Sequence, residues 1–386
     1  MLRGNCNGQS KCGFMSRSGY DALAAESTRL SKHCKVAVAT AIFGSKDKLQ
    51  QPSHLPDEAN DCFFAFVDPE SAAFVVSTAP KAVRRAGTLT ASRVGAWRLL
   101  TLPKSTSPYA QPRRASRVPK LLPFRFFPRC KYSLWIDGKL RLLVPPMELV
   151  QKYLIQPRAQ LSLQRNLKRD HIDEEVRWIE GTLSEEPEKL SGLHAVKSQW
   201  RFYRDEQEGS GNWSDSSSSS AAAAASDDDS EEEPPPPSPW MLKTACAEGA
   251  MILTDLQSPL ARCALCAWFN EWHRFSERDQ LAFSYVLHMM GLTPPMLQNG
   301  ATEPDEQQQV EGGWVRKDRR QSHKGVYLWP RHDHWNYKRN KKKGEQKRKP
   351  YVRYVGHGGC AQSKEDLKTK PNPGCEAKRS AGKRLE

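Results

Sequence analysis

The chemistry-bearing part of this chain is an acidic residue at the end of a buried strand, with two basic residues on the helix before it. Asp137 follows the apolar run Tyr132–Ile136, and Arg117 and Lys120 fall in a helical segment upstream. Open α/β sheets bind their ligands at the carboxyl ends of their strands. A carboxylate at that edge, with cations nearby, is what a nucleotide-diphosphate site requires. The alternative is a strand followed by an ordinary Asp-Gly turn.

Strands and helices that alternate along the chain must position these groups. Short apolar runs bounded by turn residues predict further strands at 35–43, 61–67, 74–77, 96–102, 249–253 and 327–329. Helical patterns follow at 147–154, 171–180, 260–271 and 276–290, and Ser276 is the expected N-cap of the last one. This alternation predicts an α/β sandwich with a mainly parallel sheet.

Composition predicts how the chain is divided. Residues 1–33 are polar and are predicted to be a disordered amino terminus, followed by a single domain at 34–295. The Ser, Ala, acidic and Pro run at 208–239 cannot bury enough apolar surface to fold, so it is predicted to be a disordered insertion in a surface loop of that domain. Residues 296–386 form a basic tail that is predicted to be mostly disordered.

The net charge of +15 belongs to the tail. Residues 316–386 contain 22 Lys and Arg against 7 Asp and Glu, so the rest of the chain has no net charge. Binding to nucleic acid or another anionic surface is therefore expected only through this tail, where KRNKKKGEQKRKP lies near aromatic residues.

The ten cysteines show no regular disulfide spacing, and a chain of 386 residues does not need cross-links to hold its core. Cys263 and Cys266 form one CxxC in an apolar helical segment, which favours two buried helix cysteines over a zinc site. No run of about 18 apolar residues occurs, so the sequence predicts no membrane span. No targeting segment is recognised at its amino terminus either.

Nucleotide-sugar glycosyltransferases of the GT-A class need three groups of residues. A first βα unit holds the nucleobase, and an acidic motif, usually Asp-x-Asp, holds Mn²⁺ or Mg²⁺ on the diphosphate. Later polar groups hold the sugar and the acceptor. This chain offers the strand at 35–43 for the first and Asp137 for the second. For the third it offers Asn270, Glu271, Asp279 and Gln280.

Four segments resemble a plant-centred glycosyltransferase-like family, whose better-known members are mucilage-related and turgor-regulation-defect Golgi proteins. They are KVAVATAIFG, DCFFAFVD, RVPKLLPFRFFPRCKYSLWIDGKL and WFNEWHRFSERDQLAFSYV, in the family's order. The resemblance implies a GT-A-like, Rossmann-like α/β/α sandwich and a Golgi location. It also implies transfer of a hexose from a nucleotide-sugar donor to a polysaccharide or glycoconjugate acceptor.

The resemblance also implies roles for individual residues. Arg117 and Lys120 would face the donor phosphates, and Asp137 would contact the metal or the donor ribose. The donor-sugar or acceptor side would be lined by Asn270, Glu271, Arg278, Asp279 and Gln280, with Asp279 or Glu271 as a catalytic base.

This chain departs from the expected pattern at two positions. Lys139 stands where a second acid of Asp-x-Asp would be, so the site either uses Mn²⁺ or Mg²⁺ on Asp137 alone or is metal-independent, with Lys139 as a fixed cation for the diphosphate. Asn166 begins a block, 166–175, that starts with His in the family. The family's amino-terminal membrane anchor is not recognised in this sequence.

Three other functions are compatible with the residues. A lipid amidase of the ceramidase kind would need a His/Asp metal cluster or a Ser/His pair, and the tightest histidine group is His332-x-His334 in the tail. A catalytically inactive protein that keeps the fold is favoured by the missing second acid. The basic tail alone would make an anion-binding protein.

Overall fold

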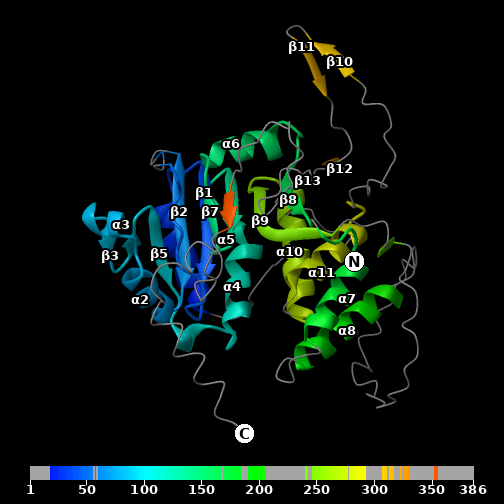
Figure 1. The fold of residues 1–386 in the computed structure, drawn as a ribbon, viewed down its shortest axis with the longest axis horizontal. Helices are drawn as coiled ribbons and strands as arrows, with labels where there is room; N and C mark the ends of the chain where they lie inside the picture. Colours follow the sequence, from blue (N-terminus) through cyan, green and yellow to red (C-terminus); the bar gives the residue numbers. More distant parts are fainter. Residues whose placement is uncertain are drawn as a thin grey trace, which may run out of the picture. The chain divides into compact units, whose positions relative to one another are not determined.

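The structure of the protein is a computed structural model (Figure 1). It describes residues 18–54, 57, 60–166, 168–183, 190–205, 240–241, 246–276, 278–292 and the strands β10 to β14 beyond them. The chain divides into two compact units. The first unit contains residues 18–156, residues 250–257 and a strand within His332–Glu386, and the second contains Pro157–Gly249 and Ser258–Arg331. The predicted domain at 34–295 therefore falls across both units.

The first unit is built on a mainly parallel sheet, as the sequence predicted. In spatial order its strands are β9 (Ala247–Asp255), β6 (Tyr132–Ile136), β1 (Val36–Ile42), β2 (Asp61–Val67), β5 (Trp97–Thr101), β4 (Arg93–Val94) and β3 (Leu89–Thr90). The strands β6, β1, β2 and β5 are parallel to one another. Antiparallel neighbours flank them, with β9 beside β6 and β4 beside β5.

Helices and short connections complete the first unit (Figure 1). The helices are α1 (Gly19–Leu30), α2 (Pro69–Ser77), α3 (Lys81–Arg85), α4 (Pro112–Leu121), α5 (Pro123–Phe126) and α6 (Pro146–Val150). A 3-10 turn lies at Lys104–Thr106, and a π-helical turn at Gln151–Ile155 continues α6. The predicted helix at 147–154 is thereby confirmed. A small antiparallel pair joins β7 (Leu140–Leu142) to β14 (Val352–Tyr354).

The central strands are covered on both faces. All seven residues of β2 are buried, and the six from Cys62 to Val67 form an uninterrupted apolar run. On one face Phe64 and Phe66 contact the rings of Phe127 and Phe126. On the other face Phe63 packs against Trp97 of β5 with ring centroids 5.1 Å apart.

Two predictions for the first unit are wrong. Residues 19–30 form helix α1 inside the segment predicted to be disordered, because Tyr20 and Ser27 are buried and donate hydrogen bonds to the carbonyls of Ala115 and Phe126. The predicted strand at 74–77 is the end of helix α2. Asp68 caps that helix by accepting a hydrogen bond from Ser71 N, so Asp68-Pro69 begins a helix as well as ending β2.

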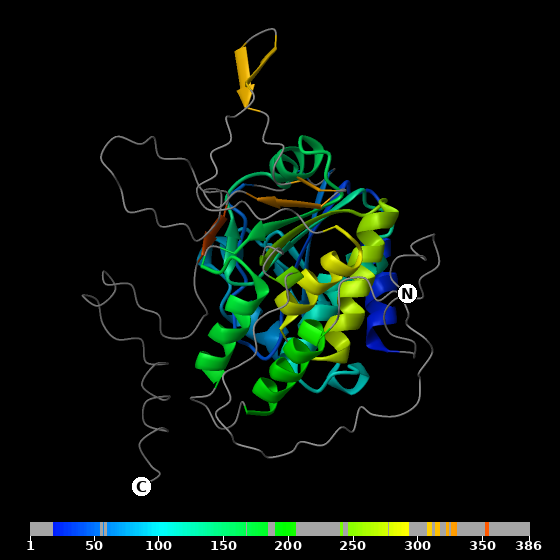
Figure 2. The same cartoon turned by 90° about the vertical axis from the view of Figure 1, so that its right-hand side faces the viewer.

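The second unit is mainly helical around a short sheet. Its helices are α7 (Ile172–Leu183), α8 (Leu190–Asp205), α10 (Pro259–Arg274) and α11 (Asp279–Met289). The green helices α7 and α8 lie side by side in both views (Figures 1 and 2). Strand β8 (Leu161–Arg165) pairs in parallel with β13 (Val326–Trp329), which pairs with β12 (Ser322–His323). A separate pair joins β10 (Gln307–Val310) to β11 (Gly313–Arg316).

The helices of the second unit share one aromatic core. Tyr203 of α8 stacks on Tyr285 of α11 with ring centroids 3.9 Å apart. Trp240 packs in the same cluster and donates a hydrogen bond from Nε1 to the carbonyl of Tyr203. The residues on both sides of the predicted insertion at 208–239 therefore meet in one core, whereas the insertion itself lies outside the described residues.

Helix α11 begins later than predicted. Its N-cap is Arg278, and the helix starts at Asp279. Ser276 is not the N-cap, because its hydroxyl is buried and donates to Gln199 Oε1 at 2.6 Å. The predicted strands at 249–253 and 327–329 are confirmed as β9 and β13. Within the part of the chain that the structure describes, no helix has both the length and the apolar character to cross a membrane.

Candidate functional site

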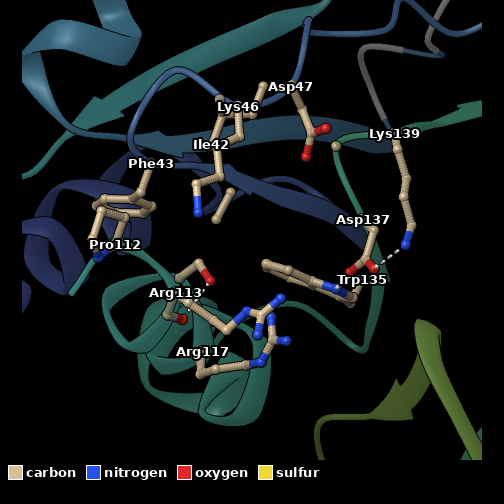
Figure 3. A pocket seen from close by; sticks show the side chains of 13 residues that line it. Ile42, Phe43, Lys46, Asp47, Pro112, Arg113, Arg117, Trp135, Asp137 and Lys139 are labelled. Carbon is tan, nitrogen blue, oxygen red and sulfur yellow. Dashed lines mark hydrogen bonds and ion pairs between the residues drawn. The ribbon is translucent and has the colours of Figure 1, made fainter. Parts of the chain in front are cut away.

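A pocket of about 170 Å³ lies in the first unit, at the carboxyl ends of the neighbouring parallel strands β1 and β6. Three segments line it: the end of β1 with the loop after it, the beginning of α4, and the end of β6 with the turn after it. This is the sheet edge at which α/β proteins bind ligands. The sequence placed Asp137 at this edge, and the structure puts Asp137, Arg117 and Lys139 together in the pocket (Figure 3).

Asp137 is held by two neighbours. The indole Nε1 of Trp135 donates a hydrogen bond to its Oδ1 at 3.0 Å, because residues two apart on a strand point to the same face. The ammonium of Lys139 lies 3.8 Å from its Oδ2. Both charged side chains are about a quarter exposed, so they stay accessible to a ligand in the pocket.

The first turn of α4 adds Arg113, a cation that the sequence prediction did not include. Arg113 and Arg117 are one helical turn apart and both line the pocket, where they point toward Trp135 and Asp137 (Figure 3). The amino-terminal end of a helix also carries a partial positive charge, which favours anions. Arg113 stands four residues before Arg117, and this i, i+4 spacing is the sequence signal that would have found it.

The loop after β1 supplies one more cation and a second acid, Lys46 and Asp47. The loop is fixed by hydrogen bonds from Gly44 N to Asp68 Oδ2 and from Ser45 N to Ser71 Oγ, both at the start of α2. Gly44 adopts a positive φ of 69°, which a glycine tolerates without strain. These contacts fold the loop toward the Asp-Gly-Lys turn.

Gly138 is where the two chain segments meet most closely. A Cβ placed on Gly138 would lie 3.2 Å from Cγ1 of Ile42 and 3.3 Å from Cβ of Asp47. A side chain at this position would therefore press on the β1 end and on the loop. The absence of a side chain lets Asp47 and Asp137 face the same pocket.

Lys120 lies elsewhere. Its side chain is buried on α4, and it is not among the residues that line the pocket. The role predicted for Lys120, from the residue pattern and from the resemblance, stays a prediction. Of the basic pair on this helix, the structure brings only Arg117 to Asp137.

The remaining predicted site residues lie in the second unit, where Arg278 and Asp279 gather around a buried acid, Glu175. The Arg169 guanidinium forms an ion pair with Glu175. Burial raises the pKa of the Glu175 carboxyl, as Asp279 also does, while Arg169 and Arg278 act in the opposite direction. Both arginines also lie over the ring of Trp178. Glu175 therefore organises this cluster.

Asn270, Glu271 and Gln280 stand on α10 and α11 of the same unit. The Tyr203 hydroxyl donates a hydrogen bond to Glu271 Oε2 at 3.3 Å. Burial raises the pKa of the Tyr203 hydroxyl, and the nearby charge of Glu271 raises it further. Asn270 is exposed, and Gln280 is half-buried. The catalytic roles of Glu271 and Asp279 stay predictions.

Four of the described cysteines form disulfide bonds, which the sequence did not predict. Cys34 and Cys62 form a disulfide at the amino ends of the adjacent strands β1 and β2, with Cα atoms 5.8 Å apart. Cys263 and Cys266 are buried on α10, as expected, and are disulfide-bonded. Strand pairing, which spacing along the chain does not reveal, brings Cys34 and Cys62 together.

The fold and the site define an α/β protein with a cation-rich pocket beside an acidic residue at the edge of its sheet. The chain belongs to the TOD1/MUCI70 family, described as a glycosyltransferase-like domain, whose pattern matches residues 4–304. The resemblance found in the sequence is thereby confirmed.

Two relatives come from Arabidopsis thaliana. Probable hexosyltransferase MUCI70 is 29% identical over 286 residues, covering 71% of this chain and 42% of the relative. Alkaline ceramidase TOD1 is 28% identical over 291 residues, covering 73% of this chain and 54% of the relative. The chain thus spans about half the length of these relatives.

Two solved structures are similar to parts of the chain. Mouse xyloside xylosyltransferase 1 in its apo form aligns with a TM-score of 0.30 and 10% identity, covering 66% of this chain and 82% of that one. The apo WbbM bifunctional glycosyltransferase aligns with a TM-score of 0.32 and 10% identity, covering 65% and 37%. With TM-scores this low, neither alignment is evidence about the site.

Proposed function

We propose that this protein is a glycosyltransferase that moves a hexose from a nucleotide-sugar donor to a polysaccharide or glycoconjugate acceptor. The observation that carries the proposal is the pocket at the ends of β1 and β6, which Asp137 lines together with four cationic residues, Lys46, Arg113, Arg117 and Lys139. Membership of a glycosyltransferase-like family supports this assignment. The name of the hexosyltransferase relative supports the choice of a hexose.

The pocket suits the diphosphate of such a donor. Its volume of about 170 Å³ is smaller than sites for whole drug-sized ligands, which start near about 300 Å³, so it accommodates one part of the donor. Guanidinium groups bind phosphate oxygens through paired hydrogen bonds. When the bond to the sugar breaks, negative charge develops on the leaving diphosphate, and fixed cations beside it stabilise that charge.

The acceptor side is proposed to involve Asn270, Glu271, Arg278, Asp279 and Gln280, as the family resemblance implies. Asp279 or Glu271 would accept the proton of the acceptor hydroxyl. A Golgi location is also part of this proposal. The Cys34–Cys62 disulfide supports it, because such bonds form and persist in oxidising compartments of the secretory route.

The test is a thermal-shift screen of the full chain with a panel of nucleotide sugars, with and without Mn²⁺. One donor is expected to raise Tm, and Asp137→Asn should reduce the rise. A ligand at a hundred times its Kd stabilises a protein by about 2.7 kcal/mol, which such a screen detects readily. The control is Glu26→Gln, which changes an exposed acid paired with Arg29 on α1. If no nucleotide sugar raises Tm, the inactive alternative is favoured.

The ceramidase alternative gains no support from the described residues. Among them, the one group of three metal-ligand side chains is His33, Cys34 and Cys62, and the two cysteines are consumed in a disulfide. The predicted His332-x-His334 group and the basic run at 338–350 lie outside the described residues. The name of the second relative is therefore the one reason to assay amide hydrolysis.

A further inference from the structure

The ligand atoms around Asp137 fit a divalent metal ion poorly. Mn²⁺ and Mg²⁺ in donor sites are usually shared between carboxylate oxygens and substrate phosphates. Here Oδ1 of Asp137 accepts the hydrogen bond from Trp135, and Oδ2 faces the ammonium of Lys139 at 3.8 Å. A metal ion on Asp137 would therefore have a cation as its neighbour, where the usual motif provides a second acid.

The charges of the pocket already balance a diphosphate. Four cationic side chains and two acidic ones line it, a net charge of +2: Lys46, Arg113, Arg117 and Lys139 against Asp47 and Asp137. A nucleotide sugar carries roughly one negative charge on each of its two phosphates. A bound dication would add two more positive charges to a pocket that needs none for neutrality.

Asp47 is the residue that could argue for a metal ion. It faces the pocket from the loop after β1, and its Oδ2 lies 3.5 Å from where a Cβ on Gly138 would be. In the described part of the chain, however, Asp47 and Asp137 belong to no group of three metal-ligand side chains whose ligand atoms lie within 4.8 Å of one another. Asp47 also offsets one of the four cations. Asp47→Asn is therefore needed to test whether a metal ion binds here.

We propose that the pocket binds the donor diphosphate without a divalent cation, and that the Lys139 ammonium takes the place of the metal ion. This inference rests on the proposed function, because it assigns the diphosphate to this pocket. Lys139 contacts the phosphate oxygens, and Asp137 fixes the position of Lys139. Arg113 and Arg117 supply the rest of the positive charge.

The experiment is calorimetric titration of the full chain with UDP and with GDP, first in EDTA and then in excess Mn²⁺. The wild-type protein is expected to bind one of them with a Kd that differs by less than about twofold between the two conditions. Lys139→Met should weaken binding roughly tenfold in both conditions, the usual effect of losing one charged contact. Lys139→Asp, which restores Asp-x-Asp, should bind weakly in EDTA and recover in Mn²⁺.

Each result decides between the possibilities. Wild-type binding that appears only with Mn²⁺ overturns metal independence but still supports a nucleotide site in this protein. If Asp47→Asn then loses the effect of Mn²⁺, Asp47 is a ligand of the ion. Equal binding by wild type and Lys139→Met in EDTA overturns the role of Lys139. If neither nucleotide binds in either condition, the proposed function itself fails. Thermal melts of each variant check that it is folded.

Discussion

The indole Nε1 of Trp135 donates a hydrogen bond to Oδ1 of Asp137 at 3.0 Å, and both side chains face the pocket. Trp135 is otherwise buried in β6, so the position of the hydrogen bond is set by the core of the sheet. The direction in which Asp137 presents its second oxygen is thereby fixed before a ligand arrives. Preorganisation of this kind reduces the cost of binding.

Trp135→Phe keeps an aromatic ring at this position and removes the N–H donor. This hydrogen bond is present without a ligand, so its loss acts on binding through the orientation of Asp137, and nucleotide affinity should fall by less than the roughly tenfold expected for Lys139→Met. Calorimetric titration with UDP or GDP measures the change. Unchanged affinity in a variant with a wild-type thermal melt would show that the hydrogen bond has no part in binding.

The two arginines on α4 should act together. Replacing Arg113 and Arg117 by methionine removes two of the four cations in the pocket, and we expect nucleotide affinity to fall by roughly a hundredfold, at roughly tenfold for each contact. The salt dependence of binding should fall as well. The matched control is Arg129→Met, an exposed arginine of the same unit outside the pocket. An equal loss in the control would point to net charge instead of the site.

The close approach at Gly138 predicts a loss of binding from a single methyl group. In Gly138→Ala the new Cβ presses on Ile42 and Asp47, so the loop after β1 must shift, and overpacking costs about 1–3 kcal/mol. Affinity for the nucleotide and Tm should both fall. The control is Gly181→Ala on α7, where a Cβ meets nothing within 4 Å and should stabilise the helix by about 0.5–1 kcal/mol. An unaffected Gly138→Ala would mean that the loop position does not matter.

The sequence predicts Asp137 as a site residue but not Asp47. Asp137 follows a five-residue buried strand, and the local pattern alone places it at a sheet edge. Lys46 and Asp47 stand in a polar loop whose sequence has no sign of a ligand. They reach the pocket only because β1 pairs with β6, 96 residues further along the chain, and because Gly138 has no side chain.

The errors in the fold have similar causes. The segment at 74–77 contains two valines and a phenylalanine, which favour strands locally, but the cap at Asp68 and the packing of Val75 make it helical. Helix α1 has a weak apolar stripe, and its docking depends on carbonyls of α4 and α5 that lie far along the chain. In both segments tertiary contacts outweigh local preference.

The disulfide between Cys34 and Cys62 should stabilise the first unit. It closes a separation of 28 residues, for which the chain-entropy model gives about 3–4 kcal/mol. The double variant Cys34→Ser, Cys62→Ser should therefore unfold at lower denaturant concentration than the wild-type protein under non-reducing conditions. Dithiothreitol should lower the stability of the wild type toward that of the variant. Equal stabilities without reductant would contradict the presence of the bond.

Asp61, at the start of β2, predicts a pH dependence of stability. Burial of the Asp61 carboxyl and, to a smaller extent, the negative charge of the nearby Asp57 raise its pKa to about 6. Between about pH 4 and pH 6 the native state then binds more protons than the unfolded state, so the free energy of unfolding falls as pH rises. Above pH 6 this contribution no longer changes. Asp61→Asn should lack the fall, which we expect to be about 2–3 kcal/mol. Urea titrations of the wild type and of Asp61→Asn at pH 4 and pH 7 measure the free energy of unfolding. The same change between the two pH values in both proteins would refute the prediction.

The central claim is that the pocket at the ends of β1 and β6 binds the diphosphate of a nucleotide sugar. Hydrogen exchange of the full chain with and without saturating UDP or GDP tests it most directly, because it reports the location of binding without a substitution. Protection is predicted in the three segments that line the pocket, at 42–47, 112–117 and 135–139. Binding that leaves these segments unprotected and protects others would contradict the claim.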